Sequence, residues 1–149
     1  MDYAVNNVKK YAVLFFLMGD AYYVLEGFWR GRSHIIMLFV GGLCGLTIGL
    51  INERTKLKIW QQCIIGTFII LAIEFIFGVI LNIWLKLNIW NYDGIFANAA
   101  GQICLPYAVL WFFLIPTSIW LYQLLTYTLY NEEKPEKLIS LYMKLFRNE

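Results

Sequence analysis

Glu74 is the side chain in this sequence best placed to do chemistry, because it is a carboxylate inside the apolar stretch of residues 62–85. A charge in hydrocarbon costs roughly 2.5–3.5 kcal/mol on insertion scales, so it requires a partner, a proton or a water-filled cavity. Gly78 and Asn82 follow at intervals of four residues, which places all three on one face of a helix. We therefore predict that Glu74 is an ion or proton site and that Asn82 shares its ligand-binding face.

A second group of ionisable residues lies nearer the N-terminus, where Glu26 and Arg30 are four residues apart and His34 follows. This spacing supports an ion pair on one helical face, which would clamp the adjoining loop. Alternatively, the carboxyl group and the imidazole act as general acid and base while the arginine holds a phosphate. The candidates for catalysis are thus Glu26, His34 and Glu74, and all three with Arg30 are candidates for ligand binding.

The segment between the last two apolar runs is rich in aromatic, amide and acidic side chains. Irregular backbone inside a membrane protein must have its polar groups satisfied, and amide side chains often do this. The other interpretation is that these side chains bind a ligand together with Glu74. The residues concerned are Trp90, Tyr92, Asp93, Asn98 and Gln102.

The elements that position these residues are predicted to be membrane-spanning helices. Of the 149 residues, 60% are hydrophobic and only 15% are charged, against about 25% charged in an ordinary soluble domain. Each predicted span has about the 17–25 residues needed to cross a bilayer. We expect an all-α protein with one membrane domain, residues 1–149. The predicted spans are residues 11–29, 35–51, 62–85 and 103–130.

Glycines recur every four residues in the second predicted span, at Gly41, Gly45 and Gly49. Small residues at this spacing allow a neighbouring helix to approach closely, so we interpret them as a packing surface. The net charge of +2 is too small to indicate a nucleic-acid partner. No residue pattern indicates a cofactor or a metal site, and membrane lipids are the expected surroundings.

The distribution of lysine and arginine predicts the orientation. One side of the predicted membrane carries nine of the 12, and the other side carries Arg30, Arg32 and Lys86. The positive-inside rule then places both termini in the cytoplasm of a multi-pass protein of the cell (inner) membrane. Residues 135–147 have apolar side chains at helical spacing among basic ones, which predicts an amphipathic helix on the inner surface. The polar residues would then form a polar, outward-opening pocket with Glu74 at its floor.

Three motifs resemble a known family. They are E-x-x-W-R-G-x-S-H from Glu26, E-x-x-x-G-x-x-x-N from Glu74, and W-N-Y-D followed by N-x-x-G-Q-I-C-L within residues 90–105. Together they resemble the bacterial family of small membrane proteins known as ABC-transporter type IV, or CmpB-like, permeases. The resemblance implies four membrane helices, with the residues of these motifs as family positions. Asn91 stands where the family usually has aspartate, so Asp93 would have to supply any carboxylate needed there.

Three functions follow as hypotheses. The favoured one is a permease-like transport component for a small polar or ionic solute. The second is a membrane-embedded enzyme that acts on a lipid or isoprenoid headgroup, and the third is an accessory subunit of a larger membrane complex. Because the sequence has no phosphate-binding P-loop, ATP hydrolysis would require another subunit. Four spans are few for a permease, so we also expect a homo-oligomer or a partner membrane subunit.

Overall fold

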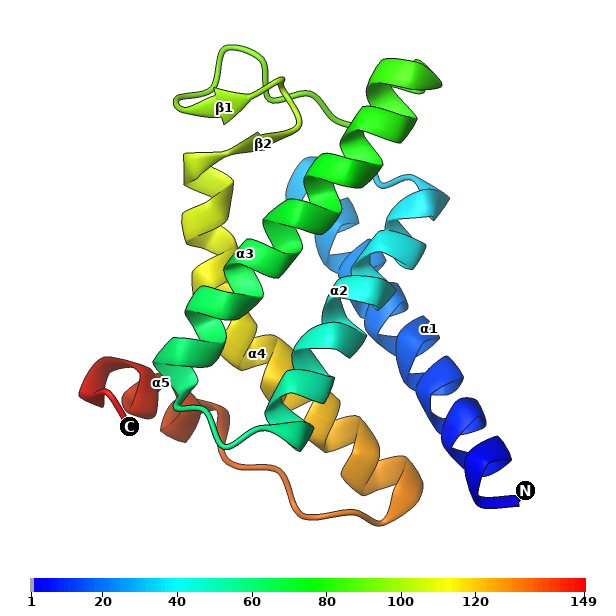
Figure 1. Cartoon of the computed structure of the whole chain (residues 1–149), viewed down its shortest axis with the longest axis vertical. Helices are drawn as coiled ribbons and strands as arrows, with labels where there is room; N and C mark the ends of the chain where they lie inside the picture. The colour runs from blue at the N-terminus through cyan, green and yellow to red at the C-terminus, as the bar shows by residue number, and fades with distance from the viewer. Residues whose placement is uncertain (1) are drawn as a thin grey trace.

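The computed structural model describes residues 2–149, which form five α-helices and one short two-stranded sheet (Figure 1). A π-helix extends the third α-helix, and the strands belong to the loop that follows it. The chain therefore has the all-α architecture predicted from its composition. The elements are α1 (Asp2–Arg30), α2 (Ile35–Arg54), α3 (Ile59–Gly78), the π-helix Val79–Trp84, β1 (Asn98–Ala99), β2 (Ile103–Cys104), α4 (Leu105–Tyr130) and α5 (Leu138–Arg147).

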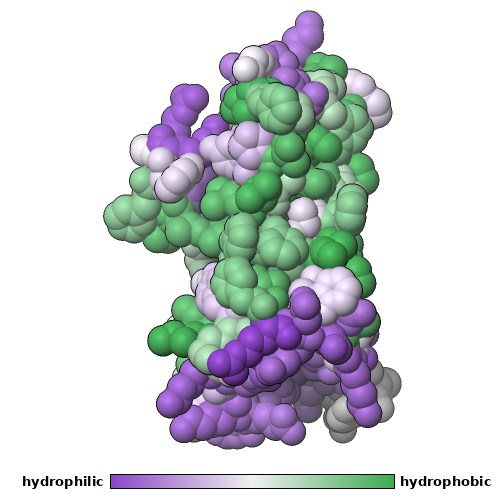
Figure 2. All heavy atoms as spheres, turned by 90° about the vertical axis from the view of Figure 1, so that its left-hand side faces the viewer, coloured by the Kyte–Doolittle hydropathy of each residue, from purple (hydrophilic) through white to green (hydrophobic). Residues whose placement is uncertain are grey.

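Four of these helical segments in the described chain are long and apolar enough to cross a membrane: Asn6–Arg30, Ile35–Arg54, Ile59–Trp84 and Leu105–Tyr130. Their outward-facing side chains are apolar as well. Phe28, Phe68 and Trp84 are 87%, 70% and 71% exposed, which is costly in water but not in lipid. Figure 2 shows hydrophobic residues over the middle of the molecule and hydrophilic ones gathered at its lower end. The protein is a multi-pass membrane protein.

The helices differ from the predicted spans at their ends. α1 and α2 extend beyond residues 11–29 and 35–51, and α3 begins at Ile59, ahead of the predicted residue 62. The fourth helix begins at Leu105, two residues after the predicted start, because Ile103 and Cys104 form β2, which pairs antiparallel with β1. Pro106 falls in the first turn of α4, where a missing backbone N–H costs nothing.

The glycines of α2 form a packing surface, as predicted. A β-carbon on Gly41 would lie 2.6 Å from Tyr22, and one on Gly45 would lie 2.9 Å from Met18, so α1 passes directly over this face. On the same face, Gly49 leaves room for the ring of Tyr122 from α4. Helices α1 and α4 thus both pack on the glycine ridge of α2.

The end of the bundle that carries both termini is closed by polar contacts, and we call it the terminal end. Lys10 is 8% exposed and lies 2.5 Å from a carboxylate oxygen of Glu132 and 3.7 Å from one of Glu53. The hydroxyl of Tyr122 donates to Glu53. These contacts join α1, α2, α4 and the segment after α4.

Helix α5 packs against α3 and α4. Leu141 and Leu145 are buried in the main apolar core, and the hydroxyl of Tyr142 donates to the Phe113 carbonyl over 2.7 Å. Other apolar residues of α5 stay on the surface, with Ile139 75% exposed. The C-terminal segment is therefore tied to the side of the bundle through one face only.

The opposite end, which we call the loop end, contains the π-helix and residues 85–104. Gly78 precedes the π-helix, and a β-carbon there would lie 2.5 Å from the Gln102 side chain. At the far side of the loop Gly101 has a φ of +66° and leaves no room for a β-carbon beside Asn91 and Asp93. Glycine at these two positions lets the loop fold back over the bundle (Figure 1).

Candidate functional site

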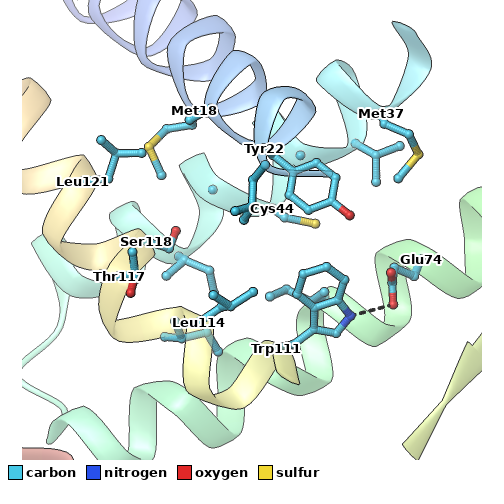
Figure 3. Close-up of a pocket in the computed structure, with 18 residues that line it drawn as sticks. Met18, Tyr22, Met37, Cys44, Glu74, Trp111, Leu114, Thr117, Ser118 and Leu121 are labelled. Atoms are coloured by element: carbon cyan, nitrogen blue, oxygen red, sulfur yellow. Dashed lines mark hydrogen bonds between the residues drawn. The ribbon is translucent and has the colours of Figure 1, made fainter. Parts of the chain in front are cut away.

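Glu74 lies on α3 just before the π-helix, and only 3% of it is exposed. The indole Nε1 of Trp111 on α4 donates a hydrogen bond to its Oε2 over 2.9 Å (Figure 3). Oε1 accepts no hydrogen bond from the described residues, and none of them forms an ion pair with Glu74. A buried carboxyl group with a single hydrogen bond from the protein requires a proton, a cation or water to complete it.

Glu74 lines a cavity of about 140 Å³ between α1, α2, α3 and α4, which we call the central cavity. Figure 3 shows Glu74, Trp111 and Tyr22 around it, and the Tyr22 and Trp111 ring centroids are 5.8 Å apart. Its walls are largely apolar. The polar side chains that line it are Tyr22, Cys44, Glu74, Trp111, Thr117 and Ser118.

A second cavity of about 230 Å³ lies toward the loop end, and we call it the loop-end cavity. The two cavities adjoin, because Tyr22, Leu25, Trp111 and Leu114 line both. The loop-end cavity adds three further aromatic residues and one ion pair to the lining. These are Trp29, Tyr92, Tyr107, Glu26 and Arg30.

The ion pair at the loop end is formed by Glu26 and Arg30 over 2.6 Å, with Glu26 only 6% exposed. The hydroxyl of Ser33 donates to the other carboxylate oxygen over 2.5 Å, and Arg30 also donates to the Ile89 carbonyl over 3.2 Å. Glu26 and Arg30 thus find their hydrogen-bond and ion-pair partners within the chain. The pair fastens the end of α1 to the loop, as the clamp interpretation of the sequence requires.

Asn82, Trp90 and Gln102 hold the loop and line neither cavity. Asn82 donates to the Gln102 side chain over 2.8 Å and accepts from the backbone N–H of Ile89 over 2.7 Å. The indole of Trp90 donates to the Gln102 carbonyl over 3.0 Å. This network positions the next residue of the family motif, Tyr92, whose ring stacks on Tyr107 at 4.7 Å and faces the loop-end cavity. Burial raises the pKa of the Tyr92 phenol, so its hydroxyl remains a hydrogen-bond donor.

The remaining predicted residues lie on the surface. His34 accepts from the backbone N–H of Ile36 and caps α2. Asn98 bonds backbone groups of its own turn, and Asp93 is exposed. Asn91 accepts from the backbone N–H of Asp93 over 2.8 Å, a turn contact that an aspartate at position 91 would also make.

The structure therefore brings together four of the ten predicted ligand-binding residues: Glu26, Arg30, Glu74 and Tyr92. It differs from the predicted pocket in character, because the walls beside Glu74 are aromatic and apolar where a polar pocket was expected. It also explains the placement of Asn82. The spacing of four continues from Glu74 to Gly78, but the backbone then changes to a π-helix, and Asn82 is used by the loop.

Sequence reasoning missed three aromatic residues of the two cavities: Tyr22 and Trp111, which line both, and Tyr107, which lines the loop-end cavity. A signal was present, because Tyr22 is four residues before Glu26 and Tyr107 is four residues before Trp111. Each pair therefore shares one helical face. Among so many aromatic residues, which make up 18% of the chain, this spacing does not stand out without the structure.

Residues 11–146 match the family described as "Putative ABC-transporter type IV". The chain belongs to this family. The match covers nearly the whole chain and agrees with the resemblance found in the three motifs. The family's description suggests a membrane protein related to ABC transporters. Comparisons with curated proteins and with solved structures gave no match.

Proposed function

We propose that the protein is a permease-like transport component that binds a small solute in the central cavity, with Glu74 as the ion or proton site. One observation carries this proposal. Glu74 is almost completely buried and lines a cavity, yet its carboxyl group accepts only one hydrogen bond from the described residues. An ionisable group inside a membrane segment is costly, so its presence beside a cavity favours a functional role.

The route we propose runs from the loop-end cavity to the central cavity, which share the Tyr22 and Trp111 rings. Leu25 and Trp29 line the loop-end cavity and are 49% and 71% exposed, which supports a mouth near the end of α1. From the excess of lysine and arginine at the terminal end we infer that this end lies on the cytoplasmic side of the inner membrane. The loop end then faces outward, and the solute enters from that side.

We favour transport over chemistry on a lipid headgroup because of how the candidate catalytic groups are used. Glu26 and Arg30 bond each other, and His34 caps α2 on the surface. A general acid or base needs to reach its substrate within hydrogen-bond distance. Of these groups, Glu74 is the one that lines a cavity without an ion-pair partner among the described residues, which fits binding better than acid–base catalysis.

Flux measurements on native membrane vesicles test the proposal, because such vesicles retain any partner subunit. Vesicles from cells with and without the protein are compared for exchange of protons, alkali cations, small amines and small anions. We expect at least one flux to depend on the protein and to be lost in Glu74→Gln. Asp20→Asn is the matched control, since Asp20 is an exposed carboxylate of α1 that lines neither cavity. Equal fluxes in both vesicle types, or a flux that survives Glu74→Gln, would contradict the proposal.

A further inference from the structure

When Glu74 is ionised, the side chains that line the two cavities carry a net negative charge. Glu26 and Arg30 neutralise each other at 2.6 Å. Glu74 is the one other acidic or basic side chain among the described lining residues, tyrosines and cysteines aside, and no described residue forms an ion pair with it. An ionised Glu74 therefore attracts a cation into the central cavity and repels an anion.

Aromatic rings continue from the carboxylate toward the mouth. The Tyr22 and Trp111 centroids are 5.8 Å apart, those of Trp111 and Tyr107 are 6.3 Å apart, and Tyr107 stacks on Tyr92 at 4.7 Å. Aromatic faces attract cations through their quadrupole, and cages of such rings recognise quaternary ammonium groups. The hydrogen bond from Trp111 to Glu74 holds one ring directly beside the charge.

The central cavity suits an alkylated cation better than a bare metal ion. A metal ion requires several oxygen ligands in place of its water shell, whereas the polar side chains here are few and the rest of the wall is apolar. Alkyl groups on a nitrogen spread the charge and pack against apolar walls. The volume also agrees: the cavity holds about 140 Å³, and an apolar cavity of about 150 Å³ accepts benzene, which is close in size to tetramethylammonium.

We propose that the central cavity binds the alkylated ammonium group of a small organic cation, with Glu74 as counter-ion and Tyr22 and Trp111 as the aromatic walls. A longer substituent on the nitrogen extends into the loop-end cavity, which adjoins it. This inference rests on the proposed function in placing the solute at Glu74. It adds the chemical class of the solute.

Binding to the purified full-length protein in lipid nanodiscs tests the inference, with tryptophan fluorescence or calorimetry as the readout. The probes are tetramethylammonium, choline, the uncharged carbon isostere 3,3-dimethylbutan-1-ol, and K⁺. Tetramethylammonium and choline are expected to bind saturably and at least about tenfold more tightly than the uncharged isostere. Equal affinity for choline and the isostere, stronger binding of K⁺, or no saturable binding of either ammonium probe would overturn the inference.

Substitutions in the wall of the central cavity test whether choline binds there. Glu74→Gln keeps the shape of the side chain and is expected to weaken choline binding about tenfold or more, while Asp20→Asn leaves it unchanged. Trp111→Phe retains an aromatic wall and is expected to weaken binding less than Trp111→Leu. A thermal unfolding curve for each variant shows that it is folded. If Glu74→Gln is folded and binds choline as tightly as the native protein does, the assignment is wrong.

The two proposals fail in different ways. A protein-dependent flux of protons or K⁺ without choline binding overturns the ammonium site and leaves transport standing. Saturable choline binding without any protein-dependent flux overturns transport and leaves the ammonium site standing.

Discussion

The hydrogen bond between Trp111 and Glu74 yields the prediction that depends most closely on the geometry of the site. The partners are 8% and 3% exposed, and they are 2.9 Å apart. A hydrogen bond to a charged group contributes about 1.5–3 kcal/mol and one between neutral groups about 0.5–1.5 kcal/mol. Trp111→Phe removes the donor, and Glu74→Leu removes the acceptor and leaves the indole N–H unpaired.

A double-mutant cycle separates this interaction from the lost volume of each side chain. The free energy of unfolding is measured for the native protein, both single variants and the double variant by reversible unfolding in mixed micelles. We expect a coupling of about 1.5–3 kcal/mol where Glu74 is ionised, falling to about 0.5–1.5 kcal/mol where it is protonated. A coupling below about 0.5 kcal/mol at every pH would refute the contact and with it the placement of the carboxylate.

Three further predictions concern the framework, all measured by the same unfolding assay or by hydrogen exchange. Gly41→Ala is expected to destabilise the bundle by about 1–3 kcal/mol, because its β-carbon meets Tyr22, while Gly27→Ala, with open space around it, does not destabilise. If both substitutions changed the free energy of unfolding equally, the packing of α1 on α2 would be contradicted. Tyr142→Phe is expected to cost about 1 kcal/mol through its lost hydrogen bonds to α4, and no loss would mean that α5 is not docked there. Asn82→Ala is expected to speed hydrogen exchange in residues 86–104 and leave α1 and α2 unchanged, whereas uniform acceleration would argue against a local role.

The architecture was predictable because it depends on long apolar runs, which report membrane helices directly. The glycine spacing in α2 was informative for the same reason, since close helix packing requires small residues at this interval. The predicted ends of the helices were less accurate. Ile103 and Cys104 are apolar and read as part of the last span, but β1 pairs with them as a strand.

The site was only partly predictable. A carboxylate in an apolar run identified Glu74, and the spacing of four identified the Glu26–Arg30 pair. The partner of Glu74 was not predictable, because Trp111 is 37 residues away and one of many aromatic residues. The use of Asn82 also depends on backbone geometry, since the π-helix that redirects it has no distinctive sequence pattern.

Chemical labelling of Glu74 tests most directly the central claim that this carboxylate faces a solute-accessible cavity. Dicyclohexylcarbodiimide adds to protonated carboxyl groups in apolar surroundings, and mass spectrometry identifies the modified residue. We predict that Glu74 is modified and that tetramethylammonium slows its modification, while any labelling of the exposed Asp20 proceeds at an unchanged rate. An unreactive Glu74, or modification that tetramethylammonium does not slow, would contradict the claim.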